Sequence, residues 1–409
     1  MPHLPESTRN LAYMLTPPFF PNEEAEHGDP VVRIHFSKFT YAAHGQIYRA
    51  FLHTPEVERL RSVSQLGTLQ TVPGMHGLSH PRIAHTLDAA VMMELVLTRE
   101  GFSDRSVAHG IVSMLLHDAA MPPYSDQGKL ACREELEEED NIGPLLDRSK
   151  PLRQLFAAFN LDREEVIAAI QGKHTVLGPL CNSRGLDLDK IAYLSEDLFY
   201  KGARGEFAVL KRTVASDPRP FDIIDNLHHT EGTWVFTNHE QVYKLLYIRA
   251  YLTKHLYHPP LHNAKEAFLE RDLPKLWQAG LLDLDAMLTL TDEGFASTVA
   301  RHLGQEQAQK YFSNSVIWFT EHERHEPLPG ESLEDLYARL QSTHTGKEDM
   351  VVRMIRPFGS GTTTRILHEG RMRRYNEVYP EKAKIIDDLT GYGHVGVYRE
   401  LPIPSSGHP

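Results

Sequence analysis

Two adjacent residues, His117 and Asp118, end an apolar run that is predicted to be helical. A buried helix end is a costly place for this pair, because an unpaired polar group there costs about 1–3 kcal/mol. Imidazole and carboxylate groups both bind metals, but adjacent helical residues point about 100° apart and complete little of a coordination sphere. Further ligands must therefore come from elsewhere in the chain, and we predict His85 and Asp189.

These two imidazoles and two carboxylates form a donor set for one divalent cation. Mixed nitrogen and oxygen ligation suits Mn²⁺, Fe²⁺, Co²⁺ or Zn²⁺ better than Mg²⁺, which prefers oxygen donors. Each residue taken singly has an ordinary structural interpretation, as a core histidine or a dipole-stabilised helix end. The order of the four along the chain favours a metal site, and we assign the neighbouring Asp187 to helix capping instead.

A helix predicted over 189–200 extends this site. Asp189, Tyr193 and Asp197 recur at steps of four and therefore share one face, with Lys190 beside them. A solvated acidic stripe would have the same spacing. Because a metal-binding residue leads the stripe, we interpret it as a surface for the phosphate and sugar of a nucleotide.

A second stripe lies on a helix predicted over 240–258, where Arg249, Thr253 and Tyr257 again recur at steps of four. Arginine suits bidentate phosphate binding, and tyrosine can stack on or hydrogen-bond a nucleoside. Alone, this stripe is a weak signal.

Composition limits the class of protein. The chain has 409 residues, 41% of them hydrophobic, and a formal net charge of −12, which argues against binding of duplex nucleic acid. Only two cysteines, Cys132 and Cys181, are present, so we expect a reducing compartment and no disulfide framework. The N-terminus lacks the pattern of a signal peptide, and no apolar run reaches the roughly 20 residues of a membrane span. We therefore predict a cytoplasmic protein without membrane contact.

The elements that must position the ligands are mostly helices. We predict a mainly α fold, an HD-domain helical core with a smaller mixed α+β C-terminal region. The expected organisation is an N-terminal arm over 1–30, a phosphohydrolase core over 31–260, and a helical and short-strand region over 261–409.

Local signals sharpen this picture. Pro55 should divide one helical run, and Ser103 or Asp104 should cap the helix that ends at His117 and Asp118. A strand is expected over 31–36, and the turn at 391–394 suggests a hairpin. The acidic run 134–140 is predicted to be a solvated helix face.

Several segments resemble the HD-domain dNTP triphosphohydrolases, the group of bacterial dGTPases and the SAM-and-HD-domain dNTPase. Segment 51–67 (FLHTPEVERLRSVSQLG) resembles the family's DTPxFxRLRxIxQLG, and 73–85 resembles PGxxHxRFEH. Segment 185–197 (GLDLDKIAYLSED), with Gly202 after it, is similar to LDADKLDYLxRDxxxxG. The likeness covers roughly residues 31–260.

The resemblance implies hydrolysis of a nucleotide to nucleoside and triphosphate, by a homo-oligomer that holds one metal ion on the four predicted ligands. It also implies a set of substrate contacts: Gln65 and Asp197 near the 3′-hydroxyl, Tyr193 against the 2′ position, Arg82, Lys190 and Arg249 on the phosphates, and Tyr257 near the base or sugar.

The chain departs from the family directly after the His–Asp pair. The family's xGHGPFSH is replaced by AAMPPYSD, in which Met121 and Asp126 stand where the family has histidines. A further family histidine has no counterpart in 133–138. We propose Asp126 as a base, because a carboxylate near a metal-bound water can accept its proton, and His174 as an acid.

The sequence thus predicts a metal-dependent hydrolase of a nucleotide phosphate ester, with a (deoxy)nucleoside triphosphate favoured. Two alternatives stay open. The enzyme can act on another phosphorylated substrate, such as a nucleoside monophosphate or a modified nucleotide. Alternatively, the chain is a nucleotide-binding protein that has lost catalysis.

Overall fold

The computed structural model describes residues 42–72, 80–201, 220–313, 317–391 and 393–401. The predicted N-terminal arm and the strand over 31–36 lie outside these residues, as do Pro73, Gly74 and Gly202 of the resembling segments.

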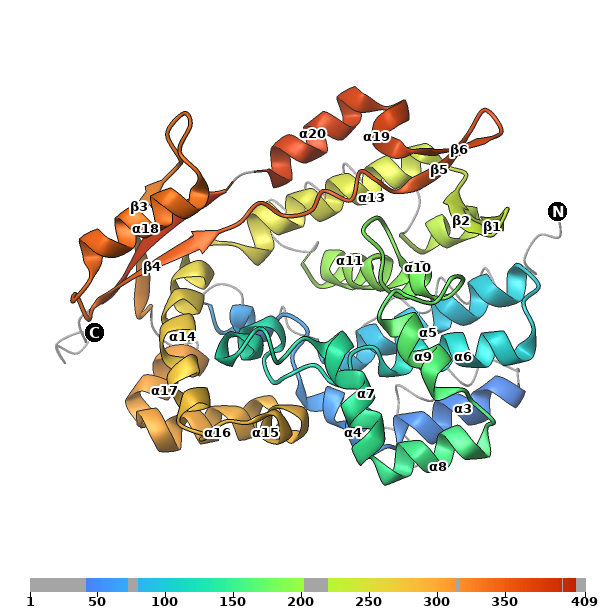
Figure 1. Ribbon diagram of the computed structural model, residues 1–409, viewed down its shortest axis with the longest axis horizontal. Helices are drawn as coiled ribbons and strands as arrows, with labels where there is room; N and C mark the ends of the chain where they lie inside the picture. Colours follow the sequence, from blue (N-terminus) through green and yellow to red (C-terminus); the bar gives the residue numbers. More distant parts are fainter. Residues whose placement is uncertain (1–41, 73–79, 202–219, 314–316, 392, 402–409) are drawn as a thin grey trace.

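The described chain is mainly helical with two small sheets, which confirms the predicted fold class (Figure 1). The helices before the first strand are α3 Ala42–Leu52, α4 Pro55–Glu58, η1 Arg59–Ser62, η2 Gly67–Thr71, α5 Arg82–Arg99, α6 Asp104–Leu116, η3 Ser125–Ala131, α7 Glu138–Arg148, α8 Lys150–Ala158, α9 Arg163–Ile170, α10 Gly178–Cys181, α11 Leu188–Lys201 and η4 Pro220–Asn226. The later helices are α13 His239–Leu252, η5 Thr253–Tyr257, α14 Pro260–Gln278, α15 Leu284–Thr289, α16 Asp292–Leu303, α17 Gln305–Phe312, α18 Leu333–His344, α19 Tyr375–Val378 and α20 Pro380–Thr390.

Local signals set the boundaries of the helices around the site. The Ser103 side chain accepts a hydrogen bond from Ser106 N and begins α6, as predicted. Pro55 begins α4 after α3 has ended, so the predicted break is confirmed. Asp187 Oδ1 accepts from Lys190 N at 2.8 Å, which confirms its capping role at the start of α11.

The strands form two sheets. One has the order β1 (Leu227–Thr230), β2 (Thr233–Phe236), β5 (Arg365–His368), β6 (Arg371–Arg374), and the other the order β3 (Phe319–His325), β7 (His394–Glu400), β4 (Met350–Ile355). All the pairs are antiparallel except β2 with β5. The first sheet therefore joins a hairpin inside the predicted helical core to the C-terminal region.

The predicted hairpin at 391–394 is wrong. These residues, of which 392 is not described, follow helix α20 directly and lead into β7, whose partners are β3 and β4. Glycine spacing alone does not reveal that a helix rather than a strand comes before the turn.

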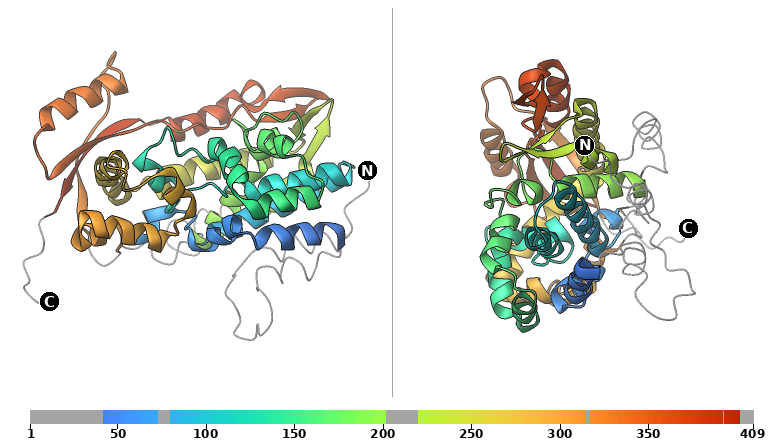
Figure 2. Two further views of the ribbon diagram at one scale, coloured as in Figure 1. Left: turned by 60° about the horizontal axis from the view of Figure 1, so that its bottom comes forward. Right: turned by 90° about the vertical axis from the view of Figure 1, so that its right-hand side faces the viewer.

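The largest apolar core surrounds α5 and α6, whose buried faces pack against α3, α9 and α11. The same core includes Leu288, Ile366, Tyr375 and Ile386 from beyond residue 261. The domain boundary at 261 thus stays a prediction. A second core forms around α14, α16 and α17, and β3, β4, β7 and α18 lie at the end of the molecule away from α3 and α6 (Figures 1 and 2).

Among the residues that the structure describes, no helix is both long and apolar enough to span a bilayer.

Candidate metal centre

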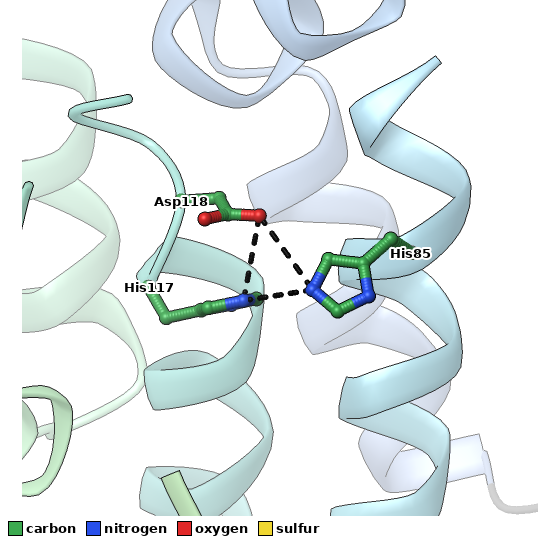
Figure 3. Close-up of side chains that lie close together, drawn as sticks. All are labelled: His85, His117 and Asp118. Atoms are coloured by element: carbon green, nitrogen blue, oxygen red, sulfur yellow. Dashed lines mark hydrogen bonds and ion pairs between the residues drawn. The ribbon is translucent and has the colours of Figure 1, made fainter. Parts of the chain in front are cut away.

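His85, His117 and Asp118 converge from two helices that pack side by side (Figure 3). His85 lies in the first turn of α5, while His117 and Asp118 directly follow the last residue of α6. All three residues are buried. Ser103 begins α6 and so fixes the point along the helix at which His117 and Asp118 follow. This position determines the direction of their side chains.

The ligating atoms of these three residues all lie within 4.8 Å of one another. His85 Nε2 and His117 Nε2 are 3.2 Å apart, and Asp118 Oδ2 lies 3.4 Å from His117 Nε2 and 3.7 Å from His85 Nε2. Atoms that bind one ion at about 2.1 Å lie about 3.0–3.4 Å apart in octahedral or tetrahedral geometry. The spacing fits a shared cation.

Asp189 approaches the same point from α11. Its Oδ1 lies 2.9 Å from His85 Nε2 and 3.5 Å from His117 Nε2. The third helix therefore brings the fourth predicted ligand to both imidazoles, as a metal site requires.

The tautomer of His117 also fits metal binding. Its Nδ1 lies 2.6 Å from the carbonyl oxygen of Met114, so Nδ1 carries the hydrogen and donates it. When Nε2 is deprotonated, as metal binding requires, its lone pair points toward the other predicted ligands. A backbone carbonyl on the distal nitrogen is a common support for metal-binding histidines.

The carboxylates of the site favour positive charge on the groups around them. Burial lowers the pKa of His117, but Asp118 and Asp189 outweigh it and raise this pKa to about 9. Burial likewise opposes ionisation of Asp189, yet hydrogen bonds from His117 and His85 bring its pKa well below the usual range. The carboxylates thus stabilise a cationic His117 ring, and a divalent cation would supply positive charge in its place.

Arg82 is fixed beside the ligands. Its Nη1 donates to Asp118 Oδ2 at 2.7 Å, and its Nε donates to Ser125 Oγ at 3.1 Å. Its Nη2 donates to the backbone oxygen of Gln65 at 3.3 Å. The predicted phosphate-binding arginine thus orients a ligand carboxylate and ties three segments together.

Lys190 is also engaged within the protein. Its Nζ donates to Asp187 Oδ2 at 2.5 Å and to the Ser183 carbonyl oxygen at 3.0 Å. Burial lowers the pKa of Lys190, and Asp187 and Asp189 more than compensate, so the pKa is raised. Lys190 is therefore a charged side chain with its own buried counterion.

The two predicted helix stripes face each other. Arg249 Nε donates to Tyr193 Oη at 3.2 Å, and Tyr257 Oη donates to Asp197 Oδ2 at 2.6 Å. The sequence suggested both stripes separately, and packing of α11 on α13 joins them. Phe358 covers Arg249, with the guanidinium carbon 4.7 Å from the ring centroid.

A cavity of about 270 Å³ opens beside the predicted metal ligands. Its described lining includes four of the predicted substrate contacts, Gln65, Arg82, Lys190 and Tyr193, but not Asp197, Arg249 or Tyr257. The complete described lining is Gln65, Arg82, His117, Asp118, Met121, Asp126, Glu138, Glu139, Ile170, Cys181, Asn182, Asp189, Lys190 and Tyr193.

Glu138 and Glu139 are the lining residues that the sequence did not suggest. The acidic run was predicted to be a solvated face, which is wrong for this pair, because helix α7 begins at Glu138 and directs both side chains to the cavity. The Glu138 side chain is only 15% exposed and forms an ion pair with Lys129. The sequence alone gives no signal for this, because Lys129, the partner of Glu138, lies before the acidic run.

Glu138 is suited to proton transfer near neutral pH. Burial raises its pKa to about 7, although the nearby Lys129 ammonium lowers it. A carboxylic acid with a pKa near the working pH can donate a proton and be reprotonated in each catalytic cycle. It stands in the region where the resembled family places histidines.

Asp126 and His174 have different surroundings. Asp126 lines the cavity at its rim, with its side chain 76% exposed and 3.6 Å from Lys129 Nζ. His174 is not among the described lining residues, and its Nδ1 accepts from the backbone of Val176 and Leu177. The structure brings Asp126, but not His174, to the cavity.

The loop that carries Asp126 is held in a strained conformation. Tyr124 and Ser125 have φ values of 54° and 56°, which non-glycine residues rarely adopt. Asp292 Oδ1 accepts from Tyr124 N at 2.6 Å and so stabilises the loop. Gly67 fits against it at φ +48°, where a Cβ would lie 2.2 Å from the Tyr124 carbonyl oxygen.

Sequence comparisons identify no family for this chain: no family model matches it, and no curated protein does. The resemblance to the dNTP triphosphohydrolases therefore depends on the quoted segments alone.

Solved structures establish the fold. A hypothetical protein from Aquifex aeolicus is 17% identical, with a TM-score of 0.68 over 87% of this chain and 92% of that one. A phosphohydrolase from Bacteroides thetaiotaomicron is 16% identical, with a TM-score of 0.65 over 87% and 95%. The chain thus shares its fold, over most of its length, with a protein described as a phosphohydrolase.

Proposed function

We propose that this protein is a metal-dependent hydrolase of nucleotide phosphate esters. The observation that carries the proposal is the convergence of His85, His117, Asp118 and Asp189 beside an open cavity. The fold shared with a phosphohydrolase supports it.

A bound divalent ion would polarise the phosphoryl group and lower the pKa of a water molecule. The chain supplies the rest of the chemistry. Asp126 accepts the proton of the attacking water, whose oxygen bonds to phosphorus. Glu138 donates a proton to the leaving oxygen as its bond to phosphorus breaks, so an alcohol and a phosphate are released.

The identity of the ester is open between two candidates. The family resemblance favours a deoxynucleoside triphosphate, with Tyr193 against the 2′ position and Gln65 near the 3′-hydroxyl. The acidic lining of the cavity favours an ester with fewer phosphates.

The test is to load the purified protein with Mn²⁺, Fe²⁺, Co²⁺, Zn²⁺ or Mg²⁺ and to supply deoxy- and ribonucleoside mono- and triphosphates. We expect release of a nucleoside with phosphate or triphosphate, and bound metal near one equivalent. If nucleotides bind and raise the melting temperature but no ester is cleaved with any metal, the protein is a binding protein and the proposal is refuted.

A further inference from the structure

Two of the cations predicted to bind phosphates already form ion pairs within the protein. Arg82 Nη1 lies 2.7 Å from Asp118 Oδ2, and Lys190 Nζ lies 2.5 Å from Asp187 Oδ2. A triphosphate carries about four negative charges, and its binding sites normally offer several cations that lack such internal partners. Neither cation in the described lining meets this condition.

The third predicted cation does not reach the cavity. Arg249 is buried, donates to Tyr193 Oη, and is covered by Phe358. Gly361 also lies against it, since a Cβ there would be 2.9 Å from Arg249 Nη1. Phe358 and Gly361 of the C-terminal region thus cover Arg249, which is not among the described lining residues of the cavity.

Carboxylates outnumber cations around the cavity. Among the described lining residues the acids are Asp118, Asp126, Glu138, Glu139 and Asp189, whereas the cations are Arg82 and Lys190. Lys129 adds one charge next to Glu138 and Asp126. With a divalent ion bound these charges balance, so the cavity has no excess positive charge to hold the roughly four negative charges of a triphosphate.

Glu139 also limits what can bind beside it in the cavity. Its carboxylate accepts hydrogen bonds, so a group bound next to it must donate them. Asn182 Nδ2 donates to Glu139 Oε1 at 3.1 Å and fixes this side chain at the cavity. Hydroxyl or amino groups of a leaving alcohol satisfy this requirement, and phosphate oxygens do not.

We propose that the cavity selects phosphate esters with a single phosphoryl group, whose leaving alcohol carries hydroxyl or amino groups, over esters of triphosphate. This inference builds on the proposed function, because it names the substrate class of that site. The reaction is hydrolysis: water forms the new bond to phosphorus, the ester bond breaks, and the released anion is inorganic phosphate.

Product binding tests the selectivity without turnover. Inorganic phosphate and tripolyphosphate are the anions that the two competing reactions release, and their affinities for the Mn²⁺-loaded protein can be measured by calorimetry in excess Mn²⁺. We expect phosphate to bind at least about tenfold more tightly than tripolyphosphate, because the cavity has no excess positive charge for the longer anion. Equal or tighter binding of tripolyphosphate, or no binding of phosphate, overturns the inference.

A variant removes one of the repelling charges. Glu139→Gln keeps an acceptor for Asn182, and we expect it to improve tripolyphosphate affinity about tenfold while phosphate affinity changes much less. The matched control is Glu134→Gln, an exposed residue of the same acidic run that does not line the cavity. If both variants alter the two affinities equally, local repulsion is not the cause and the inference fails.

Turnover separates the two proposals. Hydrolysis of nucleoside triphosphates faster than monophosphates overturns the selectivity but leaves the phosphohydrolase assignment intact. Tighter phosphate binding with no cleavage of any ester supports the selectivity of the cavity and refutes the proposed function.

Discussion

Two buried groups of charged residues in this molecule differ in how their charges are matched. The metal cluster, defined as the four predicted ligands His85, His117, Asp118 and Asp189, has the ligand atoms of the first three within 4.8 Å of one another, and Asp189 Oδ1 lies near both imidazoles. The ion-pair cluster, formed by Gln127, Glu266, Glu270 and Arg353, instead pairs its charges within the protein. Burial of charge alone therefore does not mark a functional site.

The ion-pair cluster joins η3, α14 and β4 through Gln127, Glu266, Glu270 and Arg353. Arg353 Nη1 donates to Glu266 Oε2 at 2.5 Å and its Nε to Glu270 Oε2 at 3.1 Å. Gln127 Nε2 donates to Glu266 Oε1 at 2.7 Å. Burial raises the pKa of Glu266, but Arg353 outweighs it and holds this pKa far below the usual range.

The hydrogen-bond partners of the two clusters distinguish a site that needs a bound ion from one that does not. Each Glu266 oxygen has a donor from the protein, so the ion-pair cluster is complete and acts structurally. At the metal cluster the acceptor atoms of several residues face one another at 3.2–3.7 Å, an arrangement that a cation would stabilise.

The largest effect should follow loss of a metal ligand. In Asp189→Asn and in His117→Gln we expect hydrolysis to fall to background and bound metal to fall well below one equivalent, because each change replaces a strong ligand with a neutral amide that binds these metals weakly. Metal analysis and ester hydrolysis are measured together. Full metal content in Asp189→Asn would remove that residue from the ligand set.

Glu138→Gln should lower kcat by about 10²–10⁴-fold, because the proposed proton donor is lost. The acid acts in its protonated form, so wild-type kcat should fall as pH rises through about 7, the pKa of Glu138. This alkaline limb should disappear in the variant.

The control for this prediction is Glu137→Gln. Glu137 lies 3.0 Å from the same Lys129 ammonium, but its side chain is 48% exposed and does not line the cavity. It should keep both the rate and the alkaline limb. A Glu138→Gln variant with the wild-type pH profile would assign the proton transfer to another group.

Arg353→Met should destabilise the fold by about 3–5 kcal/mol, because Glu266 would remain buried without its partner. The change should leave the metal content of the folded protein unaltered. Denaturant unfolding measures the first effect and metal analysis the second.

The matched control for Arg353 is an exposed ion pair. Arg399 Nε lies 2.9 Å from Asp349 Oδ2, with side chains 47% and 51% exposed, so Arg399→Met should cost at most about 1 kcal/mol. Equal losses in the two variants would contradict a role for burial.

The smallest effect concerns Lys265, which neighbours the ion-pair cluster. Burial lowers its pKa to about 7, and its Nζ donates to Thr71 Oγ1 at 2.6 Å. Between this pKa and its unfolded value the unfolded chain binds more protons, so stability should rise with pH by at most about 1.4 kcal/mol per unit. Thermal unfolding from pH 7 to 9 should show a shallower rise in Lys265→Met than in the wild type.

Local sequence determined much of what surrounds the site. Ser103, Pro55 and Asp187 act within a few residues of themselves, so their effects on α6, α4 and α11 were predictable. The adjacent His117 and Asp118 likewise follow from the end of one helix. The mainly α fold follows from periodicity that each helix carries in its own residues.

The contacts between residues far apart in the sequence depend on the tertiary structure. Packing of α5, α6 and α11 brings Asp189 within 2.9 Å of His85, and packing of α11 on α13 joins Tyr193 to Arg249. The sequence did not show that Glu138 lines the cavity, because spacing along a chain does not tell which side of a charge run faces solvent. The Arg82–Asp118 pair also depends on long-range packing, whereas the Lys190–Asp187 pair is local, three residues apart in the sequence. Sequence periodicity records which residues share a helical face, whereas the partner of that face depends on how the whole chain packs.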